Sequence, residues 1–97
     1  MTLDEFRRSL TDDAPGAHLP PTLQALWWDA RGDWPKAHAL VDELETRDGM
    51  AVHAYLHRKE GDADNAAYWY QRAKQPIARD TLEEEWERIA IALLAGA

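Results

Sequence analysis

Two short stretches of this sequence decide its fold: residues 32–37, which read Gly-Asp-Trp-Pro-Lys-Ala, and residues 61–66, which read Gly-Asp-Ala-Asp-Asn-Ala. Each begins with a glycine, the residue that most readily adopts the left-handed backbone that ends a helix. The aspartate that follows is a good N-cap for the next helix, and the alanine four residues further on permits close contact between helices. Each stretch therefore predicts two helices joined by a tight turn.

The similarity between the two stretches extends into their flanks. Residues 25–44 align with residues 54–73 at a shift of 29 positions, and identical residues are found at Ala25, Gly32, Asp33 and Ala37 of the first segment. Apolar positions also match, since Trp34, Val41 and Leu44 lie opposite Ala63, Tyr70 and Ala73. The sequence thus predicts two copies of one helix-turn-helix unit.

Outward from these units, glycine and proline divide the chain into segments of helix length. The second helix is expected to begin at Pro20-Pro21 and to carry the apolar stripe Leu23, Leu26, Trp27 and Ala30. The third begins after Asp33, with an inward face of Trp34, Ala37, His38, Val41 and Leu44. Gly49 is expected to precede a fourth helix from Met50 to Lys59, with Val52, Tyr55 and Leu56 inward, and the fifth runs from Asp62 along Ala63, Ala66, Ala67, Tyr70 and Ala73.

The two ends of the chain also have helical patterns. Thr2 and Glu5 form a capping box for a short first helix with Leu3 and Phe6 inward. The last helix is capped by Asp80 or Thr81, and its inward stripe is Leu82, Trp86, Ile89 and Leu93. We therefore predict one all-α domain over residues 1–97, a compact bundle of about six helices with two helix-turn-helix units and a C-terminal capping helix.

Composition narrows the range of partners and compartments. The chain has 11 basic and 18 acidic side chains, a formal charge of −7, which disfavours nucleic acid and anionic lipid as partners. No run approaches the roughly 20 apolar residues that a membrane helix needs. The first residues are acidic where a secretory signal needs bases, so a cytoplasmic protein is expected. Because cysteine is absent, disulfides and thiolate chemistry are excluded.

The turn Gly32-Asp33-Trp34 with Ala37 resembles the tetratricopeptide repeat, in which a Gly-Asp-aromatic turn joins two antiparallel helices. The second copy departs from that pattern, because Ala63 replaces the aromatic residue, and the period is shorter than the family's 34 residues. The resemblance covers about half of the chain and implies a helical-repeat fold that binds proteins or peptides. The segment from His53 to Tyr70 also resembles a family of small uncharacterised bacterial proteins, which implies no activity.

His53 and His57 are the candidate metal ligands of the sequence. They lie one turn apart on the predicted fourth helix, where two imidazoles can share a metal ion. No His-Glu-x-x-His motif surrounds them, and a third ligand would have to come from another, unidentified helix. The alternative is that His53 packs in a half-buried position and His57 forms a hydrogen bond near the turn. We therefore expect no metal or cofactor, and keep this pair as an alternative.

No sequence feature predicts catalysis. The chain has no Gly-x-Ser-x-Gly elbow and no glycine-rich phosphate loop. The adjacent acids of residues 12–13 and 83–85 are expected on solvated faces. Arg58 and Lys59 are expected to pair with nearby acids or to favour a helix C-terminus. We therefore predict a protein that is not an enzyme.

The aromatic residues Trp28, Tyr68 and Trp69 are the predicted partner-binding residues. Trp28 follows Trp27 at about 100° around its helix, so one of the two is expected to be half-exposed. If Tyr70 faces the core, Tyr68 meets solvent or a partner. The sequence therefore predicts a module that binds a protein or peptide. Two alternatives are that other helices of the chain cover these aromatics, and that the protein forms a homodimer through them or through residues 89–97.

Overall fold

Gly32 and Gly61 both have left-handed backbone conformations, with φ angles of 82° and 90°. Gly32 follows helix α2 (Pro21–Ala30) and precedes α3 (Trp34–Val41), and Gly61 ends α4 (Arg47–Glu60) before α5 (Ala63–Arg72). The side chains of Asp33 and Asp62 cap α3 and α5 by accepting hydrogen bonds from backbone N–H groups three residues later. The two turns thus have the same construction, as their sequences predict.

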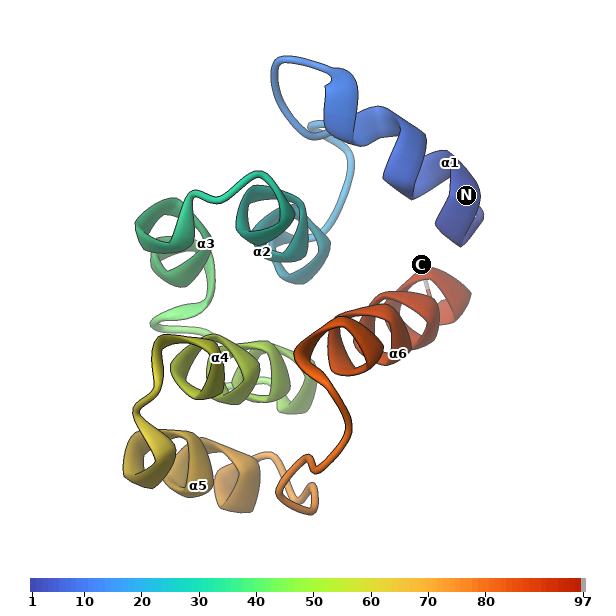
Figure 1. Cartoon of the computed structure of the whole chain (residues 1–97). Helices are drawn as coiled ribbons and strands as arrows, with labels where there is room; N and C mark the ends of the chain where they lie inside the picture. The colour runs from blue at the N-terminus through green and yellow to red at the C-terminus, as the bar shows by residue number, and fades with distance from the viewer. Residues whose placement is uncertain (97) are drawn as a thin grey trace.

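The computed structural model describes residues 1–96, and this part of the chain contains helices and no strands. The N-terminal helix α1 (Leu3–Arg8) continues into a short 3₁₀ helix, η1 (Ser9–Thr11), and α6 (Leu82–Gly96) is the last element. Thr2 and Glu5 form the expected capping box at α1. Figure 1 shows α2 beside α3 and α4 beside α5, with α6 returning toward α2 and α4. The predicted all-α bundle of about six helices is confirmed.

The main core lies between α2, α4 and α6, with α1 closing one end. Phe6, Leu26, Trp27 and Leu56 are fully buried there, together with most of the Trp86 side chain. Trp86 Nε1 donates a hydrogen bond to the Leu26 carbonyl at 3.0 Å, so the polar tip of this large ring has a partner inside the protein. Helix α6 therefore covers the inner faces of both α2 and α4.

Two details of the predicted stripes are wrong. On α2, Ala30 is exposed, and the neighbouring Asp29 is buried instead. The Asp29 carboxylate accepts hydrogen bonds from Tyr55 Oη at 2.8 Å and from Lys59 Nζ at 2.9 Å. A buried carboxylate is tolerated when it has such partners. On α5, Ala63 is exposed, since it occupies the first turn, outside the contact with α4.

Helix α4 begins earlier than predicted, because Gly49 lies inside its first turn. Thr46 is the N-cap, and its hydroxyl accepts a hydrogen bond from the Gly49 N–H at 3.0 Å. A Cβ on Gly49 would lie 2.6 Å from Leu44 Cβ, so glycine is needed here for space. Helix α3 ends at Val41, which leaves Leu44 in the connection and not in the helix as expected.

The C-terminal apolar segment is divided between the core and the surface. Ile89 and Ala90 are buried, whereas Ile91 is half-exposed, and Ala97 lies outside the described residues. Among residues 1–96, every helix is too short or too polar to cross a lipid bilayer.

Candidate metal centre

Three histidines from two helices meet on the side of α4 that faces α3. His53 and His57 project from α4 one turn apart, and His38 comes from α3, where it follows the Asp33 cap by five residues. His38 Nε2 lies 3.1 Å from His53 Nε2, and one ring nitrogen from each of the three histidines lies within 4.8 Å of the other two. The structure thus brings the predicted pair together with the third imidazole that the pair lacked.

Two tryptophans hold the imidazoles in place by stacking. Trp34 lies parallel to His38, with ring centres 4.8 Å apart and planes 9° apart. Trp69 from α5 lies on His53 with centres 4.0 Å apart. The Trp34 indole is itself fixed, because its Nε1 donates to the Leu56 carbonyl at 2.8 Å. These rings limit the rotation of two of the three imidazoles and keep water from their faces.

Glu60 orients the third imidazole. Its Oε1 lies 2.5 Å from His57 Nδ1, so the Nδ1 proton is held by the carboxylate. This tautomer leaves a lone pair on His57 Nε2, which has the Asn65 amide nitrogen 3.4 Å away. A carboxylate on the far nitrogen is the usual support of a metal-binding histidine.

His53 is held in its neutral form by its surroundings. Its side chain is 2% exposed, and its Nδ1 has no hydrogen-bond partner within the described residues. The pKa of His53 is lowered from 6.5 to about 4, chiefly by burial and then by the positive charges of His57 and His38, which Asp42 only partly offsets. At neutral pH its ring therefore carries no charge and retains a lone pair, as a metal ligand requires.

The cluster reaches solvent on the α3 side. His57 is buried like His53, but the His38 side chain is 23% exposed, and Asp42, one turn further along α3, is 56% exposed. Asp42 Oδ1 lies 3.7 Å from His38 Nε2. An ion could therefore reach the three nitrogens past His38 and Asp42 without opening of the core.

His38 is the residue of this cluster that sequence reasoning missed. We assigned it to the inward face of the third helix, which is correct, but gave it only a packing role. One sequence feature indicated a further role for His38. The aligned position in the second copy is Ala67, so the first copy has an ionisable ring on an inward face where the second has only alanine. Its contact with His53 depends on how α3 packs on α4, which the spacing of histidines along the chain does not reveal.

The predicted partner-binding aromatics do not form one surface patch. Trp28 on α2 is half-buried, edge-on to Trp27, with Lys36 Nζ 4.0 Å from its ring centre. Trp69 is half-buried against His53. Tyr68 is 54% exposed, while its neighbour Tyr70 is buried, as the sequence predicts.

The prediction that all acids of residues 83–85 are solvated is wrong, because Glu85 is buried. Its carboxylate accepts hydrogen bonds from Arg58 Nη1 at 2.8 Å and from Tyr70 Oη at 2.6 Å. Burial raises the pKa of Tyr70, and the hydrogen bond to Glu85 and the charge of that carboxylate raise it further. The expected pairing of Arg58 with an acid is confirmed, and Lys59 pairs with Asp29.

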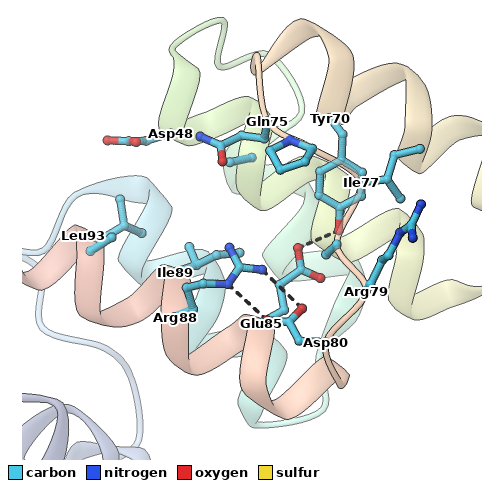
Figure 2. A pocket seen from close by; sticks show the side chains of 14 residues that line it. Asp48, Tyr70, Gln75, Ile77, Arg79, Asp80, Glu85, Arg88, Ile89 and Leu93 are labelled. Atoms are coloured by element: carbon cyan, nitrogen blue, oxygen red, sulfur yellow. Dashed lines mark hydrogen bonds and ion pairs between the residues drawn. The ribbon is translucent and has the colours of Figure 1, made fainter.

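A cleft lies beside this ion pair, between α6 and the connection from α5. The cleft has a volume of about 680 Å³, and Figure 2 shows Tyr70 and Glu85 at one end and Ile89 and Leu93 along its α6 wall. Arg88 beside it bonds to Asp80 through two nitrogens, at 3.1 and 3.3 Å. The polar groups named here are hydrogen-bonded to one another or to Arg58, so they are already engaged.

Comparison of the chain with protein-family models, with curated proteins and with solved structures found no match. The candidate function therefore rests on the geometry of the chain itself.

Proposed function

We propose that this protein binds a divalent transition-metal ion through His38, His53 and His57. The observation that carries the proposal is the convergence of three imidazoles from α3 and α4, with one nitrogen of each within 4.8 Å of the other two. Neutral imidazole nitrogens are preferred ligands of Zn²⁺, Cu²⁺, Ni²⁺ and Co²⁺, whereas Mg²⁺ and Ca²⁺ prefer oxygen. Zn²⁺ is the ion that we propose, with Co²⁺ as its spectroscopic substitute.

The spacing of the nitrogens supports this proposal. Two ligand nitrogens on one tetrahedral zinc ion, each about 2.0–2.1 Å from the metal, lie about 3.3 Å apart. The distance between the Nε2 atoms of His38 and His53 is 3.1 Å, close to this value. One of the two nitrogens donates a hydrogen bond to the other, so metal binding needs small rotations of the rings and transfer of that proton to the Nδ1 atom of the same ring, after which both Nε2 lone pairs can face one ion.

Packing alone does not account for the cluster. An unpaired polar atom in the interior costs about 1–3 kcal/mol, and the buried His53 Nδ1 has no partner within the described residues. An aliphatic side chain at this position would fill space without that cost. Together with the hydrogen bond that Glu60 makes to His57, this cost supports a binding role for the imidazoles.

Metal titration of the purified, chelator-treated protein tests the proposal. We expect one Zn²⁺ or Co²⁺ ion per chain, and a marked loss of affinity in His38→Ala, the histidine of the cluster with the most exposed side chain, with far-UV circular dichroism to verify that the variant is folded. His18→Ala is the matched control, because His18 is exposed and lies outside the cluster. Equal metal binding by the wild type and His38→Ala, or no binding by the wild type, would contradict the proposal.

We propose, as a second candidate, that the protein binds a protein or peptide partner through the outer face of α5. The supporting observation is the half-exposed ring of Tyr68, with the Arg72 guanidinium 5.8 Å from its centre, because Tyr and Arg are common at binding hot spots. Since α6 covers the inner faces of α2 and α4, those faces are not free to bind a peptide. The outer surface is what remains for a partner.

Affinity capture with variants of α5 tests this second candidate. A partner that uses this face should be lost with Tyr68→Ala and retained with Gln71→Ala, a control on an exposed position of the same helix. Light scattering distinguishes the homodimer alternative, in which the partner is a second copy and Tyr68→Ala yields a monomer. A partner list that is the same for both variants would argue against the α5 face. Neither candidate function involves catalysis.

A further inference from the structure

Asp42 is the carboxylate nearest to the open side of the histidine cluster. It lies four residues after His38, and its backbone continues the helical conformation of α3, with φ −54° and ψ −41°. Residues four apart on a helix lie on the same face, so the Asp42 carboxylate is one turn beyond the His38 ring. Its Oδ1 is 3.7 Å from the same His38 Nε2 that faces His53.

The other acids near the cluster are already engaged. Glu60 holds the Nδ1 proton of His57, and Asp62 caps α5 by accepting the Asn65 N–H at 3.2 Å. His57, Glu60 and Asp62 do lie within 4.8 Å of one another, but use of these acids as ligands would break the imidazole support and the cap. Within residues 1–96, the Asp42 carboxylate has only its ion pair with His38, and because it is exposed it can rotate without loss of packing.

From this arrangement we infer that Asp42 is the fourth ligand of the metal, an inference that rests on the proposed metal-binding function. Three neutral imidazoles leave the charge of a divalent ion uncompensated beside two buried rings, and a carboxylate offsets part of it. Zinc held by four protein ligands is typical of closed sites, whereas catalytic zinc has three protein ligands and a water. With Asp42 bound, the site retains its ion and has no position for a substrate.

The alternative for the fourth position is water. Asp42 would then remain outward as a partner of His38, and its removal would change the affinity only through its charge. A ligand and a distant charge can be separated by two variants: Asp42→Asn, which preserves shape, and Glu43→Gln, which removes a charge from the next, exposed position on the chain.

Cobalt binding measures the difference. Loss of a hydrogen-bonding partner of a metal ligand lowers metal affinity by roughly tenfold or more, and loss of a ligand itself should weaken Co²⁺ binding by at least as much. Replacement of the carboxylate by water should also change the visible absorption spectrum of the bound Co²⁺. We expect both effects in Asp42→Asn and neither in Glu43→Gln. Far-UV circular dichroism verifies that both exposed-site variants are folded.

The possible failures are distinct. Asp42→Asn with the affinity and spectrum of the wild type would overturn the assignment of Asp42 and leave the three-histidine site standing. An equal loss of affinity in Glu43→Gln would also overturn it, because the effect would then be one of net charge. A wild-type protein that binds no Co²⁺ would overturn the metal-binding function and this inference together.

Discussion

The indole of Trp69 lies flat on the imidazole of His53, with ring centres 4.0 Å apart and an angle of 19° between the planes. This contact joins α5 to the histidine cluster and forms part of the cover that keeps His53 from water. Trp69, which we predicted to contact a partner, thus contacts the histidine cluster.

Replacement of Trp69 by alanine should expose His53. Since burial is the main cause of the low pKa of His53, we expect Trp69→Ala to raise that pKa from about 4 toward 6.5 in the metal-free protein. Titration of the imidazole proton signals by NMR measures the change. Tyr68→Ala, which removes the exposed neighbouring ring, should leave the pKa of His53 where it is. An unchanged pKa in Trp69→Ala would show that this ring is not what desolvates His53.

The stability of the metal-free protein should fall in mild acid. In the folded state the pKa of His53 is about 4, against 6.5 for an ordinary histidine, because of burial and the charges of His57 and His38, opposed by Asp42. Between these values only the unfolded chain binds this proton, so the free energy of unfolding rises with pH across this window and decreases as pH falls through it. At 1.36 kcal/mol per pKa unit, the difference between the His53 pKa values of the folded and unfolded chain corresponds to about 3 kcal/mol in the free energy of unfolding.

Urea denaturation from pH 7 to pH 4, with a chelator present, measures this dependence. His53→Asn should flatten it, since position 53 then carries no ionisable group. His18→Asn is the control, because it removes an exposed histidine and should retain the slope of the wild type. Parallel curves for the wild type and His53→Asn would refute the assignment of the acid sensitivity to His53.

Loss of the Glu85 carboxylate should be strongly destabilising. Glu85→Ala leaves the Tyr70 hydroxyl without its partner and Arg58 with Asp80 alone, and removal of one member of a buried ion pair costs about 3–5 kcal/mol. Because Arg58 is partly exposed and keeps its contacts with Asp80, we expect the lower end of this range. Glu83→Ala, an exposed acid of the same helix turn, should change stability by less than about 0.5 kcal/mol. Chemical denaturation compares the two variants, and equal effects would be inconsistent with the role given to Glu85.

Alanine substitutions should separate the two uses of glycine in this chain. At Gly61 an added Cβ meets nothing within 4 Å, so Gly61→Ala is penalised only for its left-handed backbone, by about 1–2 kcal/mol. Gly49 lies in a helix, where alanine is ordinarily favoured by about 1 kcal/mol. Its Cβ would collide with Leu44, however, and we expect a net loss of stability for Gly49→Ala.

Thermal unfolding of the two variants tests this pair of expectations. A Gly49→Ala protein more stable than the wild type would mean that Leu44 moves aside at little cost. The double variant Leu44→Ala, Gly49→Ala retains the Cβ of residue 44 but lacks the rest of the leucine side chain. It therefore distinguishes a clash of the new Cβ with the Cβ and backbone of residue 44 from a clash with the remainder of the Leu44 side chain.

The turns and caps could be predicted from the sequence because their causes are local. Gly61 needs its left-handed backbone and Asp62 its bond to the Asn65 N–H, whatever the rest of the chain does. Burial of Glu85 could not be predicted in this way, because it depends on an arginine 27 residues away that reaches it across the bundle. Residue type indicates solvent exposure only when no such partner exists.

The histidine cluster shows the same limit of prediction from the sequence. His53 and His57 could be paired by spacing along one helix, but His38 joins them only through the packing of α3 on α4. Sequence periodicity indicates which face of each helix is buried, but it does not indicate how one helix is rotated against another. The histidine that completes the candidate site therefore became visible only in three dimensions.

The position of α6 limits the insertion of further helical hairpins into this chain. In open helical arrays each unit touches only its neighbours, so units can be added or lost one at a time. Here α6 contacts α2 and α1 as well as α4, and Arg7 of α1 pairs with Glu87 of α6 at 3.1 Å. Insertion of another hairpin between α5 and α6 would draw Trp86 out of its place beside Leu26. The two-hairpin arrangement is thereby closed to growth by duplication, and the helices should unfold together in one cooperative transition.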